Sequence, residues 1–244
     1  MSSRQRVLRK RLLSGAAAAE GIAVVIDVLR AFSSAAFMMH LGATEIVLLA
    51  EPEEALRFKS ETGALAVGEV GGQMVEGFDL GNSPSGIVAA GRGAFAGRTV
   101  VQRTSAGVTG AVAAARRAEQ VILGSYVTAS ATARYLQGLR PRPRTVSLIA
   151  MGNAGREKTP DDEGCASYLE HLLTETPYNH AVALQQIVGH ECTQKFLRGD
   201  RGHFPPADAV YCLQRDLFDF CLRARLEGEM LVARRVDVPK GDEA

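Results

Sequence analysis

The stretch Ile22-Ala-Val-Val-Ile-Asp-Val-Leu-Arg30 decides the fold class predicted for this chain. Its first five residues, Ile22–Ile26, are all apolar and mostly β-branched, which is typical of a strand buried on both faces. A strand is buried on both faces where helices cover both sides of a parallel sheet. The stretch therefore predicts an α/β protein. Its end, where Asp27 and Arg30 follow the strand, is a position at which such sheets carry their chemistry.

Further apolar, β-rich runs alternate with helical patterns along the chain. The predicted strands are Glu45–Leu49, Ala64–Val67, Arg98–Val101, Gln120–Leu123 and Thr145–Ile149. The helices predicted between them are Ser33–Leu41, Pro52–Glu61, Gly107–Arg117 and Ser130–Leu139. This alternation predicts a three-layer α/β/α fold with a largely parallel or mixed sheet.

The pattern becomes helical after Pro160. The predicted elements there are helices Asp162–Leu173, Ala181–Val188, Cys192–Leu197 and Ala207–Leu226, and a strand, Met230–Val238, added at one edge of the sheet. Because no Pro/Ser-rich linker or repeat divides the chain, we expect a single domain over residues 1–244. Within it, residues 1–20 are an N-terminal extension or edge element, and residues 160–228 form the mainly helical portion.

Composition narrows the functional class. Lys and Arg number 28 against 27 Asp and Glu, so the net charge of +1 provides no global attraction to nucleic acid or to an anionic membrane. The longest apolar runs are too short to cross a bilayer, and the four cysteines lack Cys-x-x-Cys spacing. We therefore expect a cytoplasmic protein with reduced thiols and without a nucleic-acid or membrane partner.

Polar residues follow several of the predicted strands. The carboxylate of Asp27 is suited to Mg²⁺, and the guanidinium of Arg30 to a planar anion, although a helix cap and a surface pair are the simpler interpretation of these two residues alone. Glu69 follows the third strand, where a lone acid is usually an ordinary loop residue. The turn-rich loop Val75–Gly86 then brings the carboxylate of Asp79.

The turn Gln102–Thr109 joins a strand to a helix. Its backbone N–H groups, with Arg103 and the nearby hydroxyls, would form a phosphate or sulfonate cradle, and an ordinary helix cap explains the same residues equally well. The segment Thr159-Pro-Asp-Asp-Glu163 has the residues of a capped helix start, and this capping explains its acids without a metal. A zinc site built from His190, Cys192 and His203 lacks a fourth ligand with suitable spacing.

Taken together, these motifs resemble one family. They are Asp27-Val-Leu-Arg-Ala31, Gly68-Glu69, Gly77-Phe-Asp-Leu-Gly-Asn-Ser-Pro84, Arg103-Thr-Ser-Ala-Gly107 and Asp162-Glu-Gly-Cys-Ala166. In order and spacing they are similar to those of the 2-phosphosulfolactate phosphatase family, from about Gly21 to at least Leu173. The resemblance implies a cytosolic, Mg²⁺-dependent α/β hydrolase that converts 2-phospho-3-sulfolactate to 3-sulfolactate on a coenzyme M pathway.

The resemblance also suggests site residues. The family's recurring acids fall on Asp27, Glu69, Asp79 and Asp162, which become the candidate Mg²⁺ ligands. Asp27 and Arg30 are the candidate catalytic residues, and the expected substrate-binding residues are Arg30, Asn82, Ser83, Arg103, Thr104, Ser105 and Gly107. Attack on phosphorus by water and attack by a carboxylate, with Asp27 as first candidate, both remain open. A homo-oligomer is the common expectation for such an enzyme.

Two departures from the family pattern concern the substrate. Val70 stands where an arginine is common, and Ala106 and Val108 replace an amide and a hydroxyl, so Arg103 is the candidate to restore the missing charge. The substrate that the resemblance implies is therefore 2-phospho-3-sulfolactate or a closely related small 2-phospho acid. The alternative is a non-catalytic small-anion-binding protein that retains the phosphate cradle.

Overall fold

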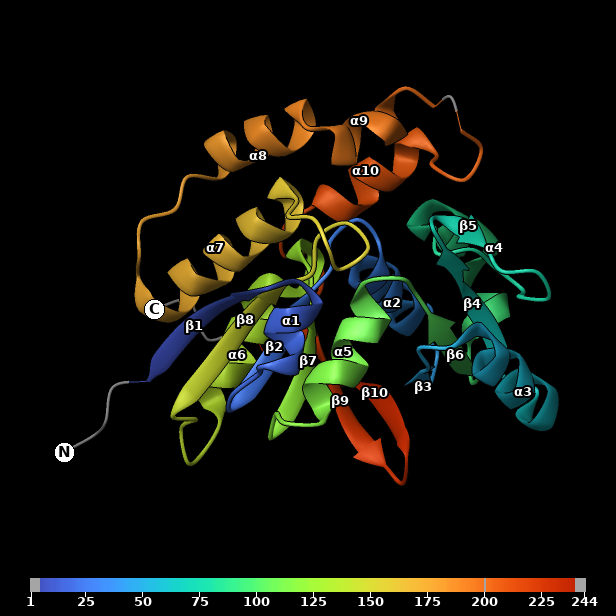
Figure 1. Cartoon of the computed structure of the whole chain (residues 1–244), viewed down its shortest axis with the longest axis horizontal. Coiled ribbons are helices and arrows are strands. Elements are labelled where there is room, and N and C mark those ends of the chain that lie inside the picture. The colour runs from blue at the N-terminus through green and yellow to red at the C-terminus, as the bar shows by residue number, and fades with distance from the viewer. Residues whose placement is uncertain (1–4, 200, 240–244) are drawn as a thin grey trace.

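The computed structural model describes residues 5–199 and 201–239 and confirms the α/β class (Figure 1). Its described strands form one mixed, mostly parallel sheet in the order β1-β8-β2-β7-β9-β10-β3-β6-β4-β5. The strands are β1 (Arg6–Arg11), β2 (Ile22–Ile26), β3 (Glu45–Leu48), β4 (Leu65–Val70), β5 (Gln73–Met74), β6 (Thr99–Arg103), β7 (Gln120–Gly124), β8 (Thr145–Ala150), β9 (Phe220–Glu227) and β10 (Met230–Asp237).

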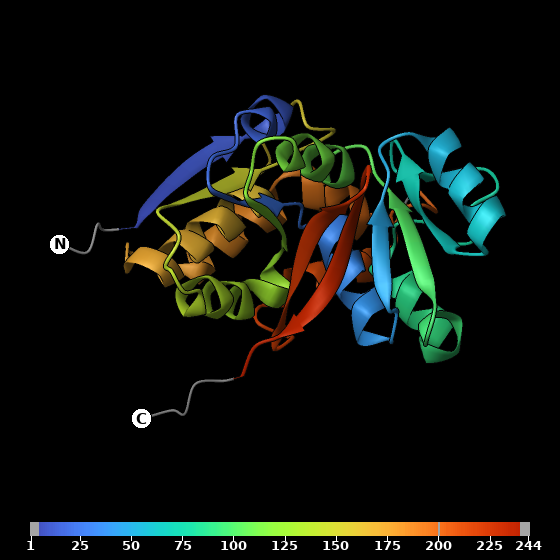
Figure 2. The same ribbon diagram turned by 90° about the horizontal axis from the view of Figure 1, so that it is seen from below.

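Helices cover both faces of this sheet (Figures 1 and 2). They are α1 (Leu12–Ala17), α2 (Ala31–His40), α3 (Pro52–Thr62), α4 (Pro84–Phe95), α5 (Gly107–Ala115), α6 (Ala129–Gly138), α7 (Pro160–Thr174), α8 (His180–Gly189), α9 (Glu191–Leu197) and α10 (Pro206–Leu213). The largest apolar cluster packs α2 and α5 against one face, while α6 and α7 cover the other face at β2 and β8. All five residues of β2 are consequently buried.

The sheet consists of two parallel halves joined by a hairpin. Strands β1, β8, β2 and β7 are parallel to one another, as are β3, β6 and β4, and the antiparallel pair β9–β10 lies between the halves (Figure 2). Three antiparallel pairings separate β7 from β3. The strands of one half therefore point in the direction opposite to the strands of the other half. Five steps lie between β2 and β6, and at 20–25° a step the sheet turns by roughly 100–125°. Helix α5 packs in the same apolar cluster as β2, and its first residue, Gly107, contacts Asp27 at the end of β2.

The predicted βα elements are confirmed up to residue 150, with no end shifted by more than three residues. The helix predicted over Ala207–Leu226 is wrong beyond Leu213, because Phe220–Glu227 is a strand in which Leu222 and Ala224 are buried and Arg225 is exposed. The strand predicted at Met230–Val238 forms, but it lies between β9 and β3 and not at an edge. Helix α4 was not predicted.

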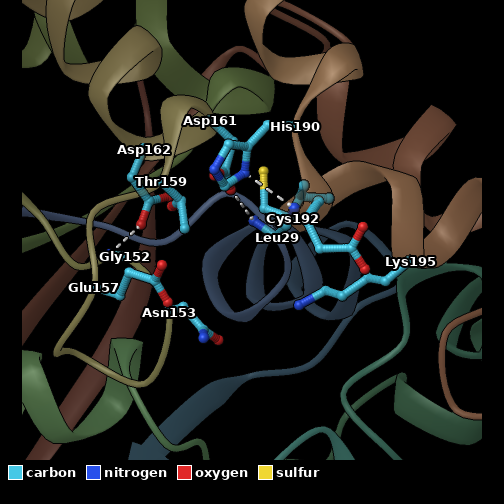
Figure 3. Close-up of a pocket in the computed structure, with 11 residues that line it drawn as sticks. Leu29, Gly152, Asn153, Glu157, Thr159, Asp161, Asp162, His190, Cys192 and Lys195 are labelled. Atoms are coloured by element: carbon cyan, nitrogen blue, oxygen red, sulfur yellow. Dashed lines mark hydrogen bonds between the residues drawn. The ribbon is translucent and has the colours of Figure 1, made fainter.

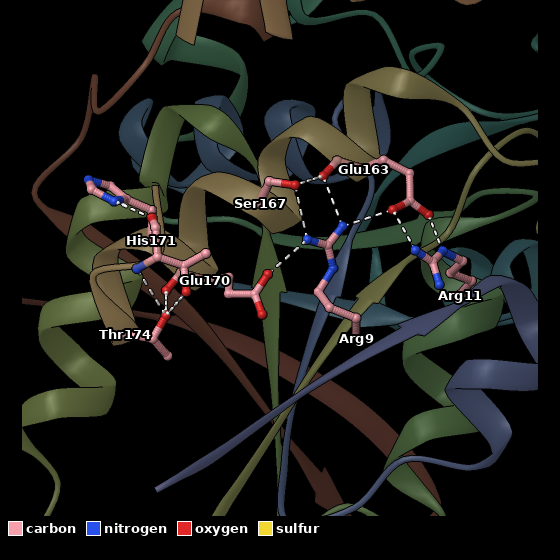
Figure 4. A network of polar contacts seen from close by, with 8 residues as sticks. Arg9, Arg11, Glu163, Ser167, Glu170, His171 and Thr174 are labelled. Atoms are coloured by element: carbon pink, nitrogen blue, oxygen red, sulfur yellow. Dashed lines mark hydrogen bonds and ion pairs between the residues drawn. The ribbon is translucent and has the colours of Figure 1, made fainter. Parts of the chain in front are cut away.

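The N-terminal residues that the structure describes include an edge strand, β1, parallel to β8, while residues 1–4 lie outside the described chain. Two arginines of β1 hold α7 against it (Figure 4). Arg9 donates to the Glu163 carboxylate at 2.8 Å and to Ser167 at 3.0 Å, and Arg11 also binds Glu163. These contacts hold the first turn of α7, which carries Asp161 and Asp162. None of the helices over the described residues is long and apolar enough to span a membrane.

Candidate active site

Two adjoining hollows lie at the carboxyl end of β2, beneath α9. The Asp161 hollow, of about 170 Å³, is lined by Asp161, Asp162 and Cys192 among others (Figure 3). The Asp27 hollow, of about 310 Å³, is lined by Asp27, Glu69, Arg30, Asn82 and Thr104–Ala106 among others. Both are bordered by Leu29, Gly152, Asn153 and Lys195. Volumes of this order suit a small molecule rather than a polymer.

Asp27 lies at the junction of β2 and α2 and is buried. Its Oδ1 accepts a hydrogen bond from the Ala31 N–H at 3.0 Å, and the Gly107 N–H also donates to the carboxylate. Burial raises the pKa of Asp27 to about 7; the Ala31 hydrogen bond opposes this shift, and the charges of Asp161 and Glu69 add to it. A side chain at Gly107 would meet Asp27 Oδ2 at 2.7 Å, so only glycine fits beside this carboxylate.

Asp161 and Asp162 both reach from the first turn of α7 to the loop after β2. The two carboxylate oxygens of Asp162 accept the N–H groups of Val28 at 2.8 Å and Gly152 at 2.7 Å, which ties the ends of β2 and β8 to α7. Burial, followed by the charges of Asp161 and Asp27, raises the pKa of Asp162 well above its usual range. Thr159, predicted to cap α7, makes no capping hydrogen bond with its side chain.

Asp161 was not among the predicted site residues. Its Oδ2 accepts the Leu29 N–H at 3.2 Å and the Cys192 thiol also interacts with this carboxylate, but Oδ1 is buried and has no hydrogen-bond partner of ordinary geometry among the described residues. An unpartnered buried carboxylate oxygen is costly unless something else binds it. The adjacent Asp161-Asp162 pair at a helix start is the signal that could have pointed to it.

Glu69 connects the end of β4 to the β6–α5 turn. Its Oε1 accepts the Ser105 N–H at 2.6 Å, and Oε2 accepts the Gly72 N–H and the Ser105 hydroxyl. Thr104 caps α5 by accepting the Val108 N–H at 3.0 Å. The amides of the predicted anion cradle are thus largely bound by the protein's own oxygens, although Thr104, Ser105 and Ala106 still line the hollow.

Arg30 is buried in an ion pair that sequence reasoning missed. Its Nη1 donates to Asp208 Oδ2 at 2.9 Å and to the His203 carbonyl at 2.8 Å. Its guanidinium also lies 5.2 Å from the Phe204 ring centroid. Asp208 is completely buried and additionally accepts hydrogen bonds from Ser83 and Ser85. Arg30 therefore holds α10 over the site and presents only part of its guanidinium to the hollow.

Of three further residues predicted to bind substrate, one lines the Asp27 hollow and two lie outside it. Asn82 is buried, lines the Asp27 hollow and accepts a hydrogen bond from Gln102 at 3.3 Å. Ser83 faces Asp208 and borders a different depression. Arg103 donates to the carbonyls of Ala50 and Glu69 and lines neither hollow.

Asp79 does not join the other acids. It is one-third exposed, pairs with Lys59 at 2.8 Å and accepts the Ala66 N–H. It borders neither hollow. The structure thus brings together Asp27, Glu69 and Asp162, with Asp161 as a fourth acid in place of Asp79.

The buried acids of the two hollows fit a divalent cation only if one or two of them bind it and other ligands complete its coordination. Among the described residues, no three His, Cys, Asp or Glu side chains converge as the ligands of one ion. Mg²⁺, however, is commonly bound by one or two carboxylates and completes its coordination with water and substrate oxygens. The unpartnered oxygen of Asp161 and the neighbouring charge of Asp27 fit that arrangement.

This α/β chain with an acid-lined, small-molecule site at its strand ends belongs to a known class of proteins. The 2-phosphosulpholactate phosphatase family matches it over residues 7–225. The chain is a member of that family, which confirms the resemblance seen in its motifs. A Bacillus subtilis protein named "Probable 2-phosphosulfolactate phosphatase" is 30% identical over 217 residues, covering 88% of this chain and 92% of that protein.

Two further relatives carry the same name. The protein of Caldicellulosiruptor saccharolyticus is 32% identical over 217 residues, which cover 82% of this chain and 87% of that protein. The protein of Thermus thermophilus is 39% identical over 140 residues, or 57% of this chain and 56% of that protein. The family match over residues 7–225 includes the site and most of the sheet.

Proposed function

We propose that this protein is a phosphatase that hydrolyses the phosphate monoester of 2-phospho-3-sulfolactate, or of a closely related small 2-phospho acid, to the 2-hydroxy acid and phosphate. The supporting observation is the group of buried acids, Asp27, Asp161, Asp162 and Glu69, around hollows of small-molecule size. Family membership and the names of the relatives give the substrate class. A cytoplasmic enzyme on a coenzyme M pathway is part of the same proposal.

Mg²⁺ is the cofactor we propose, with Asp27 and Asp161 as the residues that would hold it. Bound there, the ion would neutralise charge on the phosphoryl oxygens and lower the pKa of a bound water. The protein's own residues have separate tasks: Asp162 fixes the loops after β2 and β8 through two backbone amides, and Glu69 fixes the turn before α5. Asp79 is left out of the proposed ligand set because it borders neither hollow.

Asp27 is the first candidate to act directly on the substrate. Gly107 and Ala31 hold its carboxylate at the strand end, and its raised pKa indicates a group suited to exchange a proton near neutral pH. In water attack it would take the proton of the nucleophile. In the covalent alternative its carboxylate would attack phosphorus while the P–O ester bond breaks and the 2-hydroxy acid leaves, and water would then release the phosphate.

The alternative function is a non-catalytic small-anion-binding protein. Buried carboxylates repel an anion unless a cation offsets them, so a pure anion binder gains nothing from four of them. The protein's retention of Asp27, Glu69 and Asp162 therefore favours an enzyme.

Phosphate release tests the proposal. Purified protein is given 2-phosphosulfolactate, 2-phospholactate or 2-phosphoglycolate, each with Mg²⁺ and with a chelator. We expect chelator-sensitive release that Asp27→Asn lowers by about 100-fold or more, while the matched variant Asp79→Asn, outside the hollows, keeps most of it. Absence of release from all three substrates, with phosphate still bound, would favour the anion-binding protein.

A further inference from the structure

Lys195 lies between the two hollows. It comes from α9, beyond the last motif on which the resemblance was based, and lines both the Asp161 hollow (Figure 3) and the Asp27 hollow. Leu29, Gly152 and Asn153 share this boundary position. A molecule that occupied both hollows would therefore pass beside the Lys195 ammonium.

The Lys195 ammonium has no carboxylate partner within the described residues. Glu191, one helical turn earlier, is a usual partner for such a lysine, but it pairs with Arg198 at 2.5 Å. Lys195 Nζ lies instead 4.8 Å from the ring centroid of Phe204 and 5.4 Å from that of Phe196. The faces of aromatic rings attract a cation and place it without neutralising it. The ammonium is therefore held in position with its charge available to a ligand.

The other cations predicted for the substrate are already engaged. Arg30 is paired with the buried Asp208, and Arg103 binds two backbone carbonyls away from the hollows. Arg103 thus does not supply the charge that is missing at Val70, which is itself half exposed. The hollows hold several acids, and the proposed substrate is itself a polyanion, so a free cation at their boundary has a clear electrostatic role.

We infer that Lys195 is a specificity-determining residue that binds the second acidic group of the substrate, its sulfonate or carboxylate, while the phosphoryl group lies beside Asp27. This inference rests on the proposed function. The ammonium donates hydrogen bonds to an oxyanion that takes no part in the reaction. Lys195 therefore selects 2-phospho acids over monoesters that lack a second acid.

The test is Lys195→Gln, with Lys195→Arg as the conservative variant and Lys158→Gln as the control, because Lys158 is an exposed lysine nearby that lines neither hollow. We expect Lys195→Gln to raise KM for 2-phosphosulfolactate about tenfold to hundredfold. Lys195→Arg should recover most of the loss. For isopropyl phosphate, which lacks both acidic groups, kcat/KM should be unchanged.

Equal losses on both substrates, or no change on either, would overturn the inference. Use of 2-phospholactate identifies the group bound: a similar rise in KM indicates the carboxylate, and a rise only with 2-phosphosulfolactate indicates the sulfonate. Calorimetric binding of 3-sulfolactate separates this inference from the proposed function because it requires no turnover. Binding that weakens in Lys195→Gln supports the role of Lys195 even if no phosphate is released, whereas equal binding by both proteins, or no binding by the parent, contradicts it.

Discussion

Replacing Gly107 with alanine should damage both stability and turnover. The added methyl carbon would lie 2.7 Å from the Ala31 side chain and 2.7 Å from Asp27 Oδ2. Ordinary contacts between carbon atoms begin at roughly 3.5 Å, so either α2, which carries Ala31, or α5, which begins at Gly107, has to move by most of an ångström. Ala31 is fixed in the first turn of α2, so the Asp27 carboxylate and the start of α5 take up much of the shift.

The expected magnitude follows from this crowding. Overpacking a buried site costs about 1–3 kcal/mol, which corresponds to a Tm lower by about 2–12 °C for a chain of this length. Because Asp27 also loses its alignment with the hollow, we expect kcat to fall by about tenfold to hundredfold. Thermal unfolding followed by circular dichroism and Mg²⁺-dependent phosphate release measure the two effects.

Gly93→Ala is the matched control. Gly93 lies in the last turn of α4, after the kink at Gly91, and a methyl group there would meet nothing within 4 Å. We expect that variant to be neutral, or more stable by about 0.5–1 kcal/mol, because alanine favours a helix over glycine. Gly107→Ala protein with the parent Tm and the parent rate would refute the packing argument at Asp27.

Two further substitutions test buried polar contacts. Arg30→Ala should lower the free energy of unfolding by about 3–5 kcal/mol, because it leaves Asp208 buried without its cation; an unchanged Tm would show that the pair is not formed. Asp162→Asn should cost about 1–3 kcal/mol, because an amide oxygen can accept from Val28 or from Gly152 but its NH₂ group cannot accept from the other. Chemical denaturation of the purified variant measures this change. A midpoint equal to that of the parent would contradict a stabilising role for the two hydrogen bonds that Asp162 accepts.

Local pattern predicted much of the fold and part of the site. The buried run Ile22–Ile26 and the alternation after it were enough for the α/β class, because strand and helix periodicities are local properties. Asp27 and Thr104 follow strands β2 and β6, Glu69 is the penultimate residue of β4, and the structure brings all three to one hollow. The same local logic failed at Phe220–Glu227, where a run expected to continue a helix pairs with β7 and β10 instead.

The sequence by itself determined that Asp27 follows a strand and that Glu69 and Asp162 fall on the family's recurring acids, and hence that these three could meet. Only the tertiary structure decided the partners of the remaining side chains. Arg30 is separated by 178 residues from the carboxylate that binds it, and Lys195 reaches the site from a helix that follows the sheet's parallel strands by more than forty residues. Asp79, within the most recognisable motif, is held outside by Lys59 and the Ala66 amide. Periodicity fixes which way a residue faces within its own element, but which distant group it meets depends on the twist of the sheet and on how α9 and α10 pack over it.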